Sequence, residues 1–197
     1  MWTFEHRAQK NGYTHVAGID EAGRGPLAGP VVSAAVILPQ DFEYPGITDS
    51  KKISEKKRAA LFPVIQENAL AVGIGMADHK EIDRINILAA SLLSMKRAVE
   101  DLALSPDYLL IDGKFTIDSP LDQEAIVKGD SKSISIAAAS IIAKVTRDRI
   151  MKDLSLTFPE YEFHRHKGYP TKAHKAAILA HGPCPVHRKT FRGVKGI

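Results

Sequence analysis

The chain has 197 residues, of which 44% are hydrophobic and 25% are charged, a composition typical of a globular protein with one core. Its single cysteine excludes an intramolecular disulfide, and no stretch reaches the roughly 18 uncharged apolar residues that a membrane-spanning helix needs. The first ten residues also lack the apolar segment of a secretion signal. We therefore expect a cytoplasmic protein with no membrane partner.

Three apolar runs in the first half of the chain, residues 16–20, 30–38 and 69–77, predict β-strands. An antiparallel meander is the simplest arrangement of three such strands. Residues 82–102 then carry apolar side chains at helical spacing, which predicts one long amphipathic helix.

The second half continues with two shorter predicted strands, at 108–111 and 125–127. Ser131 or Ser133 can cap a helix that runs through the stretch IAAASIIAKVTRDRI. Prolines and glycines break the remaining tail into loops around one helix at 171–180. The resulting order, β-β-β-α-β-β-α followed by a helical tail, predicts an α/β fold with a mixed sheet.

Charge is distributed unevenly along the chain. Residues 163–197 contain eight Lys or Arg, five His and no acidic residue, so this tail carries a formal charge of +8 while residues 1–162 sum to −4. Such an asymmetry indicates a polyanion partner. A solvated basic surface is the alternative, and charge alone leaves both open.

Acidic residues stand at or near the ends of three predicted strands, in the segments VAGIDE, YLLIDG and AIVKGD. If these strands are neighbours in one sheet, Asp20, Glu21, Asp112 and Asp130 meet at one place, where clustered carboxylates require a cation. A set of oxygen ligands favours Mg²⁺ or Mn²⁺, which support phosphodiester hydrolysis. Taken singly, each acid is also typical of a turn or a strand-end cap.

The adjacent pair Asp20 and Glu21 sets a geometric condition on this site. Neighbouring side chains of a strand point to opposite faces, so both can serve one site only at a bulge or at the end of the strand.

A glycine-rich loop, residues 23–29, follows the first strand. Its spacing matches neither the dinucleotide-binding fingerprint nor the phosphate-binding P-loop. Permissive backbone beside Arg24 would still allow a sugar-phosphate to approach the main chain closely. A plain turn is the alternative interpretation.

The stretch Gly18 to Leu38 closely resembles the opening signature of ribonuclease HII, and further blocks resemble that family in its order over nearly the whole chain. These blocks are GIDEAGRGPLAGPVVSAAVIL, TDSKKIS, IDRINILAAS, LLIDG, VKGDSKSISIAAASIIAKVTRD and HRHKGYPTKAH. The resemblance implies a ribonuclease H-like mixed five-stranded sheet flanked by helices, with a small helical C-terminal region. We accordingly expect a catalytic domain at 1–158 and a basic region at 159–197 that packs on the same substrate face.

The resemblance also implies roles for individual residues. The family's four active-site acids, which hold its metal, fall on Asp20, Glu21, Asp112 and Asp130. Its backbone contact to the ribonucleotide 2′-hydroxyl falls on Gly23, Arg24 and Gly25, and its junction-sensing tyrosine falls on Tyr169.

The implied activity is that of an endonuclease that cuts the RNA strand of RNA–DNA hybrids and nicks on the 5′ side of single ribonucleotides in duplex DNA. Two Mg²⁺ or Mn²⁺ ions would act per site, leaving a 5′-phosphate and a 3′-hydroxyl. We expect a monomer without an obligate protein partner. Basic side chains would contact duplex phosphates, with Lys51, Lys52, Lys56 and Lys57 as weaker candidates beside Arg165, Lys167, Lys172, Lys175, Arg188, Lys189 and Arg192.

Two alternatives are an inactive nucleic-acid-binding module on the same fold and a type 1-like hybrid nuclease that needs a run of ribonucleotides. The presence of all four acids argues against the first. His181, Cys184 and His187 are spaced by three residues, but one cysteine among prolines makes a poor zinc site.

Overall fold

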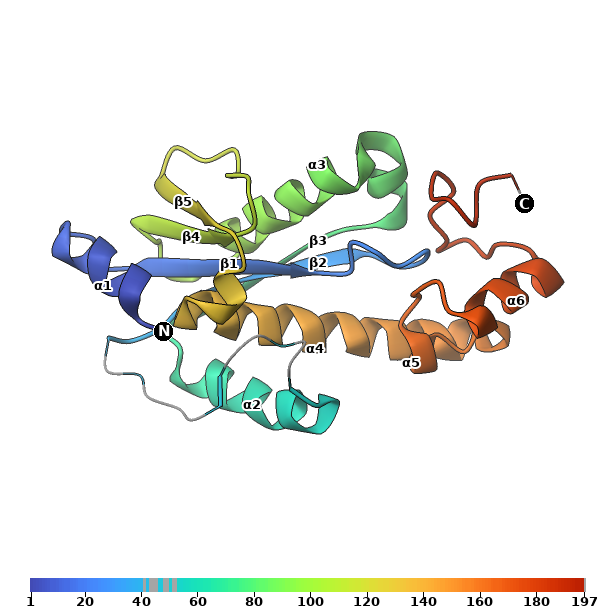
Figure 1. Cartoon of the computed structure of the whole chain (residues 1–197), viewed down its shortest axis with the longest axis horizontal. Coiled ribbons are helices and arrows are strands. Elements are labelled where there is room, and N and C mark those ends of the chain that lie inside the picture. Colours follow the sequence, from blue (N-terminus) through green and yellow to red (C-terminus); the bar gives the residue numbers. More distant parts are fainter. Residues whose placement is uncertain (41, 43–45, 48–49, 51–52, 197) are drawn as a thin grey trace.

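A five-stranded mixed sheet forms the centre of the computed structural model, which describes residues 1–40, 42, 46–47, 50 and 53–196 (Figure 1). The strand order is β3-β2-β1-β4-β5, in which β2 is antiparallel to β1 and β3, and β4 is parallel to β1 and β5. The predicted meander and mixed sheet are confirmed. The strands are β1 (Val16–Ala22), β2 (Val31–Ile37), β3 (Ala71–Ala77), β4 (Tyr108–Asp112) and β5 (Asp122–Ile126).

Two long helices cover opposite faces of the sheet, α4 (Ile134–Thr157) on one and α3 (His79–Glu100) on the other (Figure 1). Strand side chains alternate between them: Ala34 and Val36 pack in the α4 core, whereas Ala35 and Ile37 pack in the core on the α3 side. At Gly18 a Cβ atom would lie 2.2 Å from the Ser135 backbone. Only glycine lets α4 approach β1 this closely.

Serine and aspartate caps fix where these two helices begin. Of the two predicted caps of α4, Ser133 is the one used, because its hydroxyl accepts a hydrogen bond from the Ile136 amide at 3.2 Å. Helix α3 starts three residues earlier than predicted. There Asp78 accepts from the Glu81 amide at 2.8 Å, and the Glu81 carboxylate accepts from the Asp78 amide at 3.1 Å.

Two helices are absent from the predicted element order, which is wrong on this point: α1 (Thr3–Lys10) and α2 (Glu55–Asn68). Helix α1 has no side-chain cap at its N-terminus, and Pro63 lies inside α2, so each lacks a usual helix signal. Tertiary packing offsets the proline, because Leu61, Phe62 and Ile65 of α2 are buried in the core shared with α4.

The C-terminal region contains η2 (Pro159–Tyr161), α5 (Phe163–His166) and α6 (Lys172–His181), the last within one residue of its prediction. Its core includes Leu27 and Ala28 of the loop after β1, packed with Phe163 and Ile178. The main chain also joins the two parts, since the Leu27 amide donates to the Gly168 carbonyl at 2.8 Å. The glycine-rich loop is therefore built into the C-terminal region.

Within the described part of the chain, no helix is both long and apolar enough to cross a membrane.

Candidate active site

Three of the four predicted acids meet at one edge of the sheet. The pairing between β1 and β4 ends at Ile19 and Ile111, so Asp20 and Asp112 are the next residues on two neighbouring parallel strands. Asp130 follows β5 in the short helix η1 (Gly129–Ser131). One carboxylate oxygen from each of these three residues lies within 4.8 Å of the other two. The expected convergence of strand ends is confirmed.

The turn that carries Asp130 is tied directly to Asp112. The Gly129 amide donates to Asp112 Oδ1 at 2.6 Å. A Cβ atom at position 129 would lie 2.6 Å from Ile136 Cδ1 and 3.3 Å from that same carboxylate oxygen. Glycine at this position therefore lets the turn after β5 close against the end of β4, which brings Asp130 to the site.

Burial and like charge both act on Asp20, whose exposed fraction is 2%. Burial raises the pKa of Asp20 well above its ordinary value, and the neighbouring carboxylates of Glu21 and Asp112 raise it further. Hydrogen bonds from Ser140 and from the Glu21 amide, the latter at 2.7 Å, oppose this rise. Three carboxylates at this separation repel one another, and a divalent cation among them would remove that repulsion.

Glu21 stands beside the three aspartates but outside the group within 4.8 Å. Strand β1 keeps a regular register with β2 through Glu21 and Ala22, so no bulge redirects the side chain. On its other side β1 has already passed its last pair with β4, so at Glu21 the strand is paired only with β2. The Glu21 carboxylate lies 3.4 Å from Arg24 Nη1. It thus joins the acid cluster to the glycine-rich loop.

The predicted recognition residues line a cavity of about 300 Å³ next to this edge. Its walls are formed by Glu21, Ala22, Gly23, Arg24, Gly25, Ser50, Ser140, Lys144 and Tyr169. The Tyr169 side chain is exposed, and its Cε1 atom would lie 3.6 Å from a Cβ atom at position 25. The structure therefore brings Gly23, Arg24, Gly25 and Tyr169 together beside the acids.

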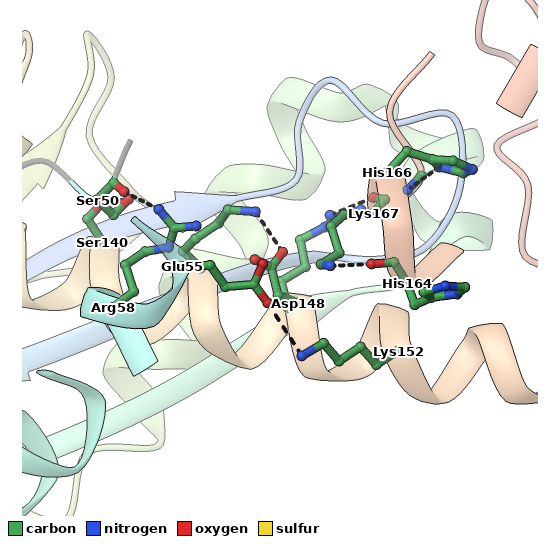
Figure 2. A network of polar contacts seen from close by, with 12 residues as sticks. Ser50, Glu55, Arg58, Ser140, Asp148, Lys152, His164, His166 and Lys167 are labelled. Atoms are coloured by element: carbon green, nitrogen blue, oxygen red, sulfur yellow. Dashed lines mark hydrogen bonds and ion pairs between the residues drawn. The ribbon is translucent and has the colours of Figure 1, made fainter. Parts of the chain in front are cut away.

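A network of polar contacts runs along α4 from Ser50 and Ser140, two residues that line the cavity (Figure 2). The hydroxyls of Ser50 and Ser140 hydrogen-bond at 2.7 Å, and Arg58 donates to the Ser50 carbonyl at 2.6 Å. Further along α4, Lys152 pairs with Glu55 at 3.4 Å. These contacts link Ser50 and the start of α2 to α4.

Two arginines near the loop are buried, which the sequence does not predict. Arg147 and Arg188 are 1% and 0% exposed. Their guanidinium groups donate to main-chain carbonyls of residues 23–30 and of Lys167. The predicted contact between Arg188 and duplex phosphates is therefore wrong, because this side chain is enclosed by the chain itself.

A buried histidine pair lies under the segment that presents Tyr169. His174 Nδ1 is 2.9 Å from the Tyr169 carbonyl oxygen, and its Nε2 is 3.0 Å from Nε2 of His187. Burial lowers the pKa of His174 to about 4, so the ring is neutral at pH 7. The sequence motif around Tyr169 contains His174 but gives no sign of this contact.

Most of the basic residues predicted to contact phosphates are exposed. Lys167 is half-buried, whereas the exposed ones are Lys56, Lys57, Arg165, Lys172, Lys175, Lys189 and Arg192. Lys51 and Lys52 lie outside the described residues.

The chain is similar to known proteins over nearly its whole length. Residues 17–194 match the family model of ribonuclease HII. The chain is 63% identical to ribonuclease HII of Geobacter metallireducens, covering 99% of this chain and 92% of that one. It is 57% identical to ribonuclease HII of Bacillus pumilus, covering 100% and 77% of the two chains. The crystal structure of ribonuclease H2 from Pyrococcus horikoshii superposes with a TM-score of 0.76 at 26% identity, covering 92% of this chain and 95% of that one. The chain belongs to the ribonuclease HII family and is an endonuclease of the ribonuclease H type.

Proposed function

We propose that this endonuclease cuts the RNA strand of RNA–DNA hybrids and nicks on the 5′ side of single ribonucleotides in duplex DNA. The observation that carries the proposal is the meeting of Asp20, Asp112 and Asp130 beside a cavity lined by Gly23–Gly25 and Tyr169. Carboxylates at such a separation are suited to metal-dependent hydrolysis. The adjoining loop and tyrosine are suited to recognising a sugar.

The metal ligands in this proposal are the three aspartates and Glu21. Their hard oxygen donors fit Mg²⁺ or Mn²⁺, and two such ions would supply an activated water and offset charge on the entering and leaving oxygens. Asp20 lies on the central strand and interacts with both Glu21 and Asp112, which suits a bridging role. Glu21 and Asp112 would then serve one ion, and Asp130 the one that binds the attacking water.

In this proposal, residues that line the adjoining cavity recognise the ribonucleotide. The main chain of Gly23, Arg24 and Gly25 would contact the 2′-hydroxyl, and Tyr169 would stack beside the sugar next to the cut. Because the 2′-hydroxyl is not the nucleophile in metal-dependent hydrolysis, it remains available for recognition, and the products carry a 5′-phosphate and a 3′-hydroxyl.

The two parts of the chain would act on one substrate. In this proposal residues 1–158 supply the acids, while residues 159–197 pack on the same substrate face and supply Tyr169. Exposed cations of the second part, such as Lys172, Lys175 and Arg192, would contact duplex phosphates.

The proposal needs no second protein chain, because every residue named in it belongs to this one. An archaeal relative, 25% identical with a TM-score of 0.69, is known from a structure of the PCNA:RNase HII complex from Archaeoglobus fulgidus. For the present chain we propose a monomer that nicks without such a partner. The buried Cys184 thiol also suits a reducing, cytoplasmic location.

A duplex that carries one ribonucleotide tests the proposal. Incubation with Mg²⁺ or Mn²⁺ should give a nick on the 5′ side of that ribonucleotide, and a chelator should abolish it. A duplex with four consecutive ribonucleotides and an all-DNA duplex serve as controls. Cutting of the four-ribonucleotide duplex alone would indicate a type 1-like specificity. If neither ribonucleotide-containing duplex is cut in the presence of metal, the chain would instead be an inactive binding module.

A further inference from the structure

The Arg188 guanidinium lies at the centre of the turn that carries Gly23–Gly25. It donates to the carbonyl oxygens of Gly23 at 2.6 Å, Pro26 at 2.8 Å, Arg24 at 3.0 Å and Gly29 at 3.0 Å. Arg188 lies about 160 residues further along the chain than this loop. It nevertheless contacts four of the loop's peptide groups.

Because these four carbonyls face Arg188, the geometry of the peptide group also shows where the adjoining amides of the loop point. In a trans peptide the carbonyl oxygen and the next residue's N–H point in opposite directions, and the described chain has no cis peptide. The Pro26 carbonyl illustrates this, because it faces Arg188 while the Leu27 amide of the same peptide donates away from it, to the Gly168 carbonyl.

The same reasoning applies to the peptides after Gly23 and Arg24. Their carbonyls face Arg188, so the N–H groups of Arg24 and Gly25 point away from the guanidinium. Neither of these two amides donates in the hydrogen bonds found among the described residues. Both residues line the cavity that also contains Tyr169.

We propose that Arg188 is a positioning residue for ribose recognition, which holds the loop so that the amides of Arg24 and Gly25 donate to the substrate 2′-oxygen. This inference rests on the proposed role of Gly23–Gly25. It assigns to the C-terminal region a part in recognition that is distinct from contact with phosphates.

An arginine is needed here because of its shape. Its planar guanidinium group carries five N–H donors in fixed directions. Four hydrogen bonds from this group reach the carbonyls of four different residues. A lysine has the same charge but only one nitrogen, so it cannot hold all four peptides in these orientations. Arg147 holds a different set of carbonyls, those of Ala28, Pro30 and Lys167, and so provides a matched buried cation.

The test compares Arg188→Lys with Arg147→Lys. For each variant, binding is measured to two duplexes that differ only by a 2′-hydroxyl at the target position, in the presence of chelator so that nothing is cut. Arg188→Lys should reduce the preference for the 2′-hydroxyl by about tenfold, the factor that one hydrogen bond represents. Arg147→Lys should change both affinities together and keep the preference. Thermal unfolding of each variant reports its fold.

Retention of the full preference by a folded Arg188→Lys variant would overturn the inference. So would an equal loss of preference in both variants, because that indicates a general loosening of the loop.

A second measurement needs no substitution. In the unmodified protein, the amide NMR signals of Arg24 and Gly25 should shift more on adding the duplex with the 2′-hydroxyl than on adding its all-DNA counterpart. Equal shifts would show that these amides do not contact the 2′-oxygen, and the proposed recognition by the loop would then fail as well. Unequal shifts together with an unaffected Arg188→Lys variant would reject only the role of Arg188.

Discussion

The acid edge, formed by Asp20, Asp112 and Asp130, lies next to the glycine-rich loop at residues 23–29, and the two are built in different ways. The acids are side chains that project from or just beyond hydrogen-bonded strands, so the sheet itself places them. The loop presents main-chain groups, and Arg188 from the C-terminal region holds the carbonyls of Gly23 and Arg24 at its start. Arg147 from α4 holds those of Ala28 and Pro30 at and just after its end. In the proposed function, chemistry at this site would therefore depend on side-chain carboxylates, whereas recognition would depend on a backbone shape that the distant Arg188 imposes.

The largest expected effect comes from changing the acid edge. Asp20→Asn removes the most central of the proposed metal ligands while keeping the size of the side chain. Cleavage of an RNA–DNA hybrid should fall by about a thousandfold or more, since ion binding and charge neutralisation both suffer. The rate under single-turnover conditions measures this. Residual activity within tenfold of the unmodified protein would remove Asp20 from the chemistry.

The same substitution should have the opposite effect on stability without metal. The pKa of Asp20 is raised in the folded protein, so the folded state favours the protonated form and loses stability as the pH rises above the ordinary value near 3.8. An uncharged Asn avoids this loss. Thermal unfolding at pH 7 with chelator should therefore show a higher midpoint for Asp20→Asn, and added Mn²⁺ should raise only the midpoint of the unmodified protein.

The next largest effect should come from the recognition side. Tyr169→Ala removes an exposed ring that forms one wall of the cavity, and stacking on a nucleotide is worth roughly 1–3 kcal/mol. Nicking at a single ribonucleotide should fall roughly tenfold to a hundredfold, with a smaller loss on a run of four ribonucleotides. Equal losses on the two substrates would contradict a role of Tyr169 in sensing the junction.

Lowering the pH should destabilise the folded protein, because protonation of the buried histidine His174 opposes folding of the C-terminal region. Burial lowers the pKa of His174 to about 4, from 6.5 in the unfolded chain, so the unfolded state binds the proton first. The free energy of unfolding should fall as the pH drops from 6.5 towards 4, by up to about 3 kcal/mol for this residue. His174→Gln should flatten that dependence, whereas His181→Gln, at an exposed position, should leave it unchanged. Urea unfolding at several pH values measures both.

The smallest effect concerns exposed cations. Lys175 and Arg192 are exposed on the C-terminal region, and each contact with a phosphate contributes about one unit to the slope of log affinity against log salt. The double variant Lys175→Gln, Arg192→Gln should lower that slope by up to about two and weaken all duplexes alike. A change in preference between ribonucleotide and deoxyribonucleotide duplexes would mean that these side chains also take part in recognition.

The sequence predicted the acid edge well because its signals are local. Asp20 and Asp112 come directly after apolar runs, and parallel neighbouring strands place such residues side by side. Helix α2 was missed because Pro63 disrupts the helical pattern, and burial against α4 compensates only in the folded protein.

Burial of Arg188 could not be predicted in the same way. Its partners are carbonyl groups, which every residue possesses, so no side-chain pattern marks them in the sequence. A basic tail indicated only charge, and Arg188 looked no different from Lys189, which is exposed. The position of Glu21 beside the three aspartates likewise depends on where the pairing of β1 with β4 stops.

Whether cutting and recognition are separable can be measured on the Asp20→Asn variant alone. Its affinity is determined, with chelator, for two duplexes that differ only in the 2′-hydroxyl at the target position. If the loop and Tyr169 carry recognition, this variant cuts neither duplex in Mg²⁺ or Mn²⁺ and still prefers the 2′-hydroxyl as strongly as the unmodified protein does. Loss of that preference together with cutting would show that the acids themselves recognise the ribonucleotide, and would contradict the division between the two regions.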